Sequence, residues 1–150
     1  MTLTKKLMPL EIMQKIVIDT NVLVSALIQK GYSYQILYGA FNDSQIQICI
    51  SKNLFEEYFD VLNRTRFSKY PDFLTNANTL LSHLESIAVY FNPKIKINII
   101  KDADDNKLLE LAETAKAQFL ITGNTNDFTI KSYKTTQIVT PKEYWEMYSK

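Results

Sequence analysis

The sequence predicts an α/β domain of three layers, in which helices cover both faces of a central, mainly parallel sheet of about five strands. Short, mostly continuous apolar runs, typical of strands buried on both faces, alternate along the chain with helical patterns. That alternation favours βαβ crossovers and hence parallel strands. The length of 150 residues is that of one domain and allows roughly 70% of the unfolded surface to be buried, so one compact core is expected.

Five apolar runs are the predicted strands: IVI at 16–18, IQICI at 46–50, IAVYF at 87–91, FLIT at 119–122 and QIV at 137–139. The second run contains Cys49, the one cysteine of the chain, which we interpret as a small buried core residue. A single cysteine cannot form an internal disulfide, so a reducing cytoplasm is the predicted compartment.

Helical patterns lie between these strands, with apolar residues spaced along one helix face. They cover 22–27, 36–41, 54–62, about 72–84, about 104–116 and the residues after Pro141. Ser33 and Ser51 stand where N-caps belong, and Pro71 precedes the fourth pattern. The order of strands and helices is therefore that of a single α/β unit.

The predicted domain covers residues 15–150, because no repeat, low-complexity tract or Pro/Gly-rich linker divides it. Residues 1–14 are predicted to be a short N-terminal extension and not an export signal, since they lack an apolar core and a small-residue cleavage site. No run approaches the ~20 apolar residues of a membrane span, so no membrane partner is expected. The net charge of +1 gives no global electrostatic case for nucleic acid, although a local basic patch fits within a balanced total.

Asp19 ends the first predicted strand, and ligands of open α/β sheets bind beyond the carboxyl ends of strands. A carboxylate at the end of a buried strand is costly to desolvate unless a cation meets it. Capping is the ordinary alternative, because Asp19, Thr20 and Asn21 can all cap a helix that starts at Val22. Taken alone, Asp19 leaves both interpretations open.

Three carboxylates crowd the start of the helix predicted at 104–116. At 100° per residue, Asp105 falls about 40° from Leu109 and about 20° from Ala112, so it should point toward the sheet. Asp104 lies farther from this apolar stripe and Asp102 precedes the helix, which favours solvated or capping roles for these two.

Two further elements carry acids near predicted strand ends. In the helix at 54–62, Glu57 is one turn before an apolar residue and one turn after another, which weakly favours it over Glu56 and Asp60 as the inward acid. After the fourth strand, a Gly/Asn turn leads to Asp127, and an ordinary turn is the alternative interpretation.

All four elements place oxygen ligands at one predicted rim of the sheet. Several carboxylates within a few Å repel one another unless a divalent cation compensates them. Oxygen ligands without a cysteine cluster favour Mg²⁺ or Mn²⁺ over zinc. His83 lies late in a helical stretch, away from this rim, and is expected to be structural or exposed.

The segments VIDTNVL, SKNLFEEYFDVL, DDNKLLELA and LITGNTNDF occur in this order, and together they resemble the PIN-domain nucleases over about residues 15–140. The resemblance is closest to bacterial PIN-family toxins, whose wider group includes the VapC ribonucleases of toxin–antitoxin operons. It implies a metal-dependent endoribonuclease acting with Mg²⁺ or Mn²⁺. Its acidic quartet falls on Asp19, Glu57, Asp105 and Asp127 as catalytic and metal-binding residues.

The resemblance also implies supporting residues and departs from the family at one place. Thr20, Asn21 and Thr122 match positions that orient the carboxylates by hydrogen bonds. Asn124 occupies a place where many relatives have aspartate, which favours Asp127 as the charged ligand and leaves Asn124 as a neutral or water-mediated one.

The expected partners are RNA, an antitoxin protein and a second copy of the chain in a homodimer. Contacts to RNA phosphates are predicted for a set of basic residues: Arg64, Arg66, Lys101, Lys131 and Lys134. The alternative function is an RNA-binding or RNA-processing PIN module with weak or no catalysis. A receiver-type phospho-accepting domain is disfavoured, because VIDTN lacks paired acids and QIVTP lacks a lysine.

Overall fold

The computed structural model of the protein describes residues 13–124 and 128–148. Its strands are β1 (Gln14–Ile18), β2 (Ile46–Ile50), β3 (Val89–Tyr90), β4 (Phe119–Ile121), β5 (Ser132–Tyr133) and β6 (Thr136–Val139). Its helices are α2 (Thr20–Ile28), α3 (Tyr32–Phe41), α4 (Lys52–Leu62), α5 (Phe73–Ile87), α6 (Ala103–Ala115) and α7 (Pro141–Tyr148), with a 3₁₀ turn at Thr65–Phe67.

The strands form one six-stranded sheet in the order β3-β2-β1-β4-β6-β5. Every pairing is parallel except that of β5 with β6, where Ser132 lies opposite Gln137, so the predicted mainly parallel sheet is confirmed. The first three strands run outward in sequence order, and the chain then returns to the other side of β1 for β4. The carboxyl ends of β1 and β4 therefore lie at the point where the strand order reverses, the usual ligand position in such sheets.

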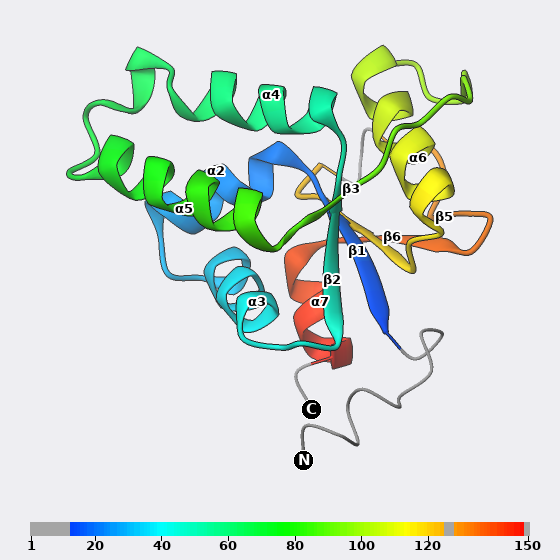
Figure 1. Ribbon diagram of the computed structural model, residues 1–150, viewed down its shortest axis with the longest axis horizontal. Coiled ribbons are helices and arrows are strands. Elements are labelled where there is room, and N and C mark those ends of the chain that lie inside the picture. Colours follow the sequence, from blue (N-terminus) through cyan, green and yellow to red (C-terminus); the bar gives the residue numbers. More distant parts are fainter. Residues whose placement is uncertain (1–12, 125–127, 149–150) are drawn as a thin grey trace.

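Helices cover the sheet on both faces, as predicted (Figure 1). Helix α6 packs on β1, β2 and β4 from one side, whereas α3 contacts β2 from the other and is itself packed against α2 and α7. Helices α4 and α6 both begin at the upper edge of the sheet in Figure 1, where β1 and β2 end. The core is continuous, because the central strands β1, β2 and β4 contribute buried residues to both faces.

Several predicted boundaries are corrected. Helix α2 begins at Thr20, two residues before the predicted start, because Asp19 is the N-cap. Ser51 caps α4 as predicted, its Oγ accepting the Leu54 N–H at 3.0 Å. Ser33 is not a cap: α3 starts at Tyr32 after Gly31, and Ser33 is buried in its first turn.

The third predicted strand is shortened, because α5 continues to Ile87 and leaves only Val89–Tyr90 in the sheet. A sixth strand, β5, was not predicted, since two residues with no apolar run give no strand signal.

Two further expectations concern single features. Cys49 is buried in the core as predicted, and burial raises the pKa of its thiol to about 12. His83 is exposed on α5, with its ring edge-on to Phe41 at a centroid separation of 4.5 Å. Among the residues that the structure describes, no helix has the length and apolar character required to cross a membrane.

Candidate active site

Asp19 lies where β1 ends and α2 begins, at the reversal of strand order. Its backbone N–H donates to the Ile121 carbonyl of β4 at 2.9 Å, which continues the sheet pairing to this residue. Its Oδ1 accepts the Thr20 N–H at 2.7 Å and so caps α2. The sequence left helix capping and a functional role as alternatives for Asp19. The two roles are compatible, because Oδ1 caps the helix while Oδ2 accepts hydrogen bonds from other side chains.

Side chains from two strand ends hold the second oxygen of Asp19. Thr122, which is 0% exposed, donates its hydroxyl to Asp19 Oδ2 at 2.8 Å, and Asn21 Nδ2 donates to the same oxygen at 3.2 Å. Asn21 is held in turn by the Gly123 N–H, 2.9 Å from its Oδ1. A Cβ at Gly123 would lie 3.3 Å from that oxygen, so this close approach favours glycine. The carboxylate of Asp19 is therefore fixed in orientation.

Asn124 follows this cluster. Its backbone N–H donates to the Thr122 hydroxyl oxygen at 3.1 Å, while the residue itself is exposed. Its participation as a neutral ligand stays a prediction.

Glu57 is the acid of α4 that turns toward Asp19. It is half-buried, whereas its neighbour Glu56 is exposed, and the Thr20 hydroxyl donates to Glu57 Oε2. The next residue, Tyr58, is fully buried and donates its hydroxyl to the carbonyl of Ile18, the last residue of β1. These two hydrogen bonds fasten α4 to the end of β1, and thus place Glu57 beside Asp19.

Burial and the charge of Glu57 both act on the Asp19 carboxylate. Asp19 is only 9% exposed, and this burial is the main reason why its pKa is raised above the ordinary value. Hydrogen bonds from Thr122 and Thr20 oppose the rise, while the negative charge of Glu57 adds to it. The pKa of the Tyr58 phenol is also raised, by burial first and then by Asp19 and Glu57. The fold thus keeps the carboxylates of Asp19 and Glu57 close together where they are largely shielded from solvent.

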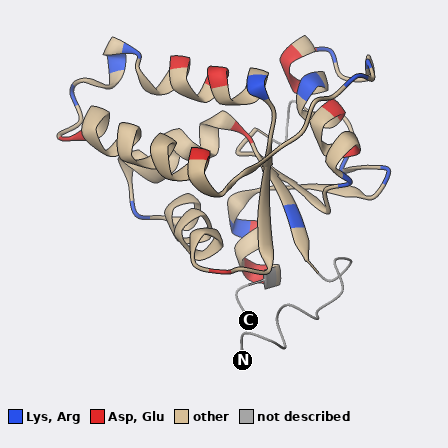
Figure 2. Cartoon of the chain, in the orientation of Figure 1, with Lys and Arg blue, Asp and Glu red and all other residues tan. Residues whose placement is uncertain are grey.

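The start of α6 presents three acids at the same edge of the sheet (Figure 2). Asp102 is the N-cap, with Oδ1 accepting the Asp104 N–H at 2.8 Å. Asp104 is exposed and Asp105 is half-buried, which matches the face expected for each from the helix angles.

Asp127, the fourth predicted acid, lies outside the described residues, and its role stays a prediction. Within 13–124 and 128–148, no three Asp, Glu, His or Cys side chains gather as a metal-binding group. What the described residues bring together is the pair Asp19 and Glu57, with Thr20, Asn21 and Thr122 around it.

Asn106 was missed in the sequence, where it looks like an ordinary helix residue. It is 5% exposed, and its Oδ1 accepts the N–H groups of Ile99 and Ile100 at 3.2 and 2.9 Å. Its Nδ2 donates to the carbonyls of Ile100 and Asp102 at 2.7 and 3.3 Å. Asn106 therefore fixes the loop that leads into the acidic start of α6.

Replacing Asn106 with alanine is expected to lower the free energy of unfolding by about 3 kcal/mol, because the buried N–H and carbonyl of Ile100 lose their partner and the part-buried bonds to Ile99 and Asp102 are also lost. Urea unfolding measures this change. Asn63→Ala is the matched control: Asn63 is exposed and its side-chain Nδ2 donates to the Phe59 carbonyl at 2.8 Å, a bond whose loss should cost at most about 1 kcal/mol. Equal effects of the two substitutions would contradict the role assigned to Asn106.

The predicted RNA-binding residues are dispersed. Arg64 and Arg66 follow the far end of α4, and the Arg66 guanidinium lies 4.8 Å from the Phe67 ring centroid. Glu57 lies five residues before Leu62, the last residue of α4, and this length of helix corresponds to about 7.5 Å. Lys131 is exposed at the opposite side of the sheet, beside β5.

The other two basic residues differ in their surroundings. Lys101 is exposed just before α6. Lys134 forms an ion pair with Glu113, with Nζ and Oε2 3.0 Å apart, and its contact with phosphates stays a prediction.

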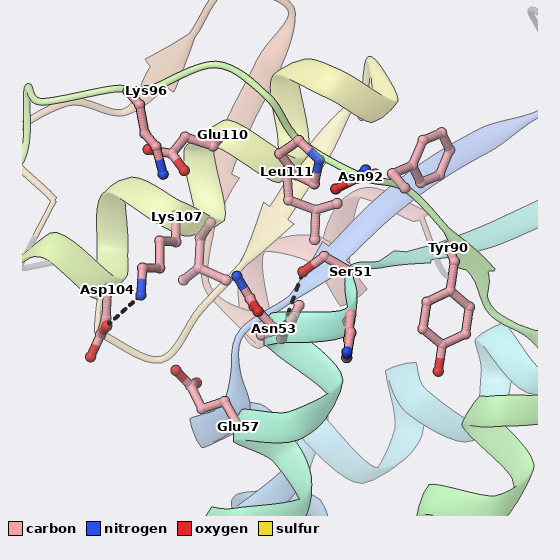
Figure 3. A pocket seen from close by; sticks show the side chains of 15 residues that line it. Ser51, Asn53, Glu57, Tyr90, Asn92, Lys96, Asp104, Lys107, Glu110 and Leu111 are labelled. Carbon is pink, nitrogen blue, oxygen red and sulfur yellow. Dashed lines mark hydrogen bonds and ion pairs between the residues drawn. The ribbon is translucent and has the colours of Figure 1, made fainter.

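A cavity of about 510 Å³ opens beside Glu57, between α4 and α6 (Figure 3). The segment 90–96 that follows β3 forms its third wall. Three lysines line it, none of which was selected from the sequence: Lys52, Lys96 and Lys107. They are far apart along the chain, and although Lys52 and Lys107 lie in segments quoted for the resemblance, Lys96 does not, so spacing gives little signal for the three together.

Comparison with known proteins agrees with this geometry. A family model described as "PIN domain" matches residues 15–126, which is most of the chain. The chain belongs to the PIN-domain family. PIN domains are in general nucleases, so the protein has a nuclease-like fold. The chain is also 32% identical over 148 residues to the uncharacterized protein MJ1680 of Methanocaldococcus jannaschii, covering 91% of this chain and 92% of that protein.

Proposed function

We propose that this PIN domain is a metal-dependent endoribonuclease that hydrolyses RNA phosphodiester bonds with Mg²⁺ or Mn²⁺. One observation carries the proposal: at the reversal of strand order, Thr20 joins Asp19 to Glu57, because its backbone N–H donates to Asp19 Oδ1 and its hydroxyl donates to Glu57 Oε2. A carboxylate as buried as Asp19, with the half-buried Glu57 beside it, is unfavourable without a compensating cation, so a structural role alone does not account for the pair.

The side chains around Asp19 suit a divalent ion with a preference for oxygen ligands. The two ion pairs between described residues are formed by Lys107 and Lys134 with other acids, so neither Asp19 nor Glu57 has a lysine or arginine partner in that part of the chain. Oδ1 of Asp19 accepts one N–H bond, which leaves an acceptor position on that oxygen. Asp19, Asp105 and Asp127 would hold one ion, and Glu57 would hold a second ion or orient the attacking water.

A bound divalent ion supplies Lewis-acid chemistry and neutralises charge that develops on the phosphate. The protein supplies the orientation. Thr122 and Asn21 hold the Asp19 carboxylate in one rotamer, and Thr20 holds Glu57 toward it. Because both acids are fixed before substrate binds, little reorganisation is needed when a phosphodiester enters.

Removal of divalent ions with EDTA is expected to abolish cleavage of a labelled single-stranded RNA, and added Mn²⁺ or Mg²⁺ should restore it. Calorimetric titration of the metal-free protein with Mn²⁺ should show saturable binding that depends on the carboxylates. Saturable binding without cleavage would favour the alternative, an RNA-binding module with weak catalysis. Full cleavage of the RNA in the presence of EDTA would contradict the proposed dependence on a divalent metal ion.

We also propose that the protein is the toxin of a toxin–antitoxin pair, on the basis of its family membership and the resemblance to the VapC group. Induced expression in a bacterial host should then arrest growth, and co-expression of a small protein encoded next to it should relieve the arrest. Growth arrest that no neighbouring protein relieves would shift the proposal toward RNA processing. A homodimer and a cytoplasmic location stay predictions.

A further inference from the structure

The cavity between α4 and α6 is directly beside the candidate active site, because Glu57 lines both (Figure 3). Its volume of about 510 Å³ lies within the range of cavities that bind small ligands and cofactors. The first turn of α4 forms one wall, the first turns of α6 face it, and the segment 90–96 closes one side. No residue in these walls has a role in the function proposed above except Glu57.

The lysines of this cavity carry charges that their surroundings neutralise only in part. Lys107 Nζ lies 3.9 Å from Asp104 Oδ1, and both side chains are more than half exposed, so this pair is weak in water. Lys52 and Lys96 have no carboxylate partner among the described residues. The buried acid in the wall, Glu110, is already engaged, with Oε2 accepting the Ile97 N–H at 3.0 Å. Glu57 and Asp104 also line the cavity, so its acids and lysines are equal in number, and it is the ammonium groups of Lys52 and Lys96, which lack a carboxylate partner among the described residues, that are placed to bind an anionic group.

The positive end of α4 adds to these charges. Ser51 caps the helix by accepting the Leu54 N–H, and the following residues of the first turn line the cavity. The helix dipole favours negative charge at this place. Lysines and a helix N-terminus at one cavity suit a phosphate group.

The remaining wall suits an unpaired base. Tyr90 is 47% exposed and lines the cavity, so its ring offers a stacking surface. The exposed residues Asn53 and Asn92, from α4 and from the segment after β3, bring amide donors and acceptors to the same space. These are the groups that read the edges of single-stranded bases.

We propose that this cavity binds one unpaired nucleotide of an RNA substrate, adjacent to the phosphodiester that the carboxylates cleave. The lysines hold its backbone phosphate, Tyr90 stacks on its base, and Asn53 and Asn92 contact the base edge. The inference rests on the proposed function and extends it, because it predicts that single-stranded RNA is preferred to a duplex, whose bases are paired and stacked.

The phosphate contacts are tested by binding, independently of cleavage. A fluorescent single-stranded oligoribonucleotide is titrated in EDTA against Asp19→Asn protein, in which cleavage is prevented and one negative charge is removed. Adding the substitutions K52A, K96A and K107A should weaken affinity roughly 10-fold or more and lower the salt slope by about 0.7, the value for one phosphate contact on a single strand. The matched control is K30A, K69A and K142A, three exposed lysines outside the cavity, which should change affinity less than about threefold.

The base contact is tested with two exposed tyrosines. Tyr90→Ala should weaken single-stranded RNA binding about fivefold or more and leave duplex RNA binding unchanged. Tyr32→Ala, which removes a ring that is 43% exposed on α3, should leave both affinities unchanged. The same measurements on the protein with native Asp19 show whether either result depends on the asparagine substitution.

Equal losses in the cavity and control triple variants would overturn the inference, as would equal effects of Tyr90→Ala on single-stranded and duplex RNA. The two proposals fail separately. If the protein binds RNA through the cavity but cleaves none, the cavity proposal stands and the proposed nuclease activity is wrong. If the protein cleaves RNA and the cavity variant binds RNA with unchanged affinity, the nuclease proposal stands and the cavity proposal is wrong.

Discussion

Asp19→Asn is expected to lower the rate of metal-dependent RNA cleavage by at least about 10³-fold, which corresponds to about 4 kcal/mol of transition-state stabilisation. Asparagine preserves the size of the side chain but removes the negative charge that a divalent ion requires. It also offers only one acceptor oxygen, whereas Asp19 uses one oxygen for the Thr20 N–H and the other for Thr122 and Asn21. Initial rates on a labelled single-stranded RNA with Mn²⁺ measure the effect, and a rate within about tenfold of the native protein would contradict it.

The pH dependence of the free energy of unfolding shows separately how Asp19→Asn affects stability. The pKa of Asp19 is raised in the folded protein above its ordinary value of 3.8, so the folded state binds the proton more tightly than the unfolded chain. As pH rises from about 3.8 through the raised value, the native protein must lose stability relative to Asp19→Asn, which has no group to titrate there. Urea unfolding at about pH 3.5 and about pH 7 should show this relative loss, with unchanged circular dichroism. The opposite sign would mean that the carboxylate is stabilised as an anion in the folded state.

Much of the fold could be predicted because it depends on periodicities that lie within one segment. Continuous apolar runs located five of the six strands, including the short edge strand β3, and a serine three residues before Leu54 located the start of α4. The same reasoning separated acids within a helix: the angle from Leu109 favoured Asp105 over Asp104, and the apolar neighbours favoured Glu57 over Glu56. In each case the apolar residues show which face of the helix packs on the core, so the sequence alone indicates which acid points inward.

Features that depend on contacts between distant segments could not be predicted in this way. β5 forms only by pairing with β6, and Ser33 resembles a cap although the helix starts before it. Asn106 is important because of a loop that has no periodic pattern of its own. The cavity joins α4, α6 and the segment 90–96, and the lysines within it become neighbours only after folding.

Glu57, the second acid of the pair, allows a test with an internal control, because the adjacent Glu56 on α4 is exposed whereas Glu57 is half-buried. Glu57→Gln is expected to lower kcat/KM for RNA cleavage about 10²-fold, since glutamine can still accept the Thr20 hydroxyl but can neither take a proton from the attacking water nor bind a second ion as an anion. Glu56→Gln makes the same charge change at an exposed position one residue earlier, and should alter kcat/KM less than about twofold.

This pair of variants separates local chemistry from the general effect of charge on RNA attraction. A charge effect on RNA binding would raise the affinity of both variants alike, because each removes one negative charge from the same helix. Loss of activity in Glu57→Gln alone, with a largely unchanged KM, means that Glu57 acts on the reacting groups. If both variants retain activity, the hydrogen bond from Thr20 to Glu57 serves only to attach α4 to the sheet, and the attacking water must be oriented by the acids of α6 or by Asp127.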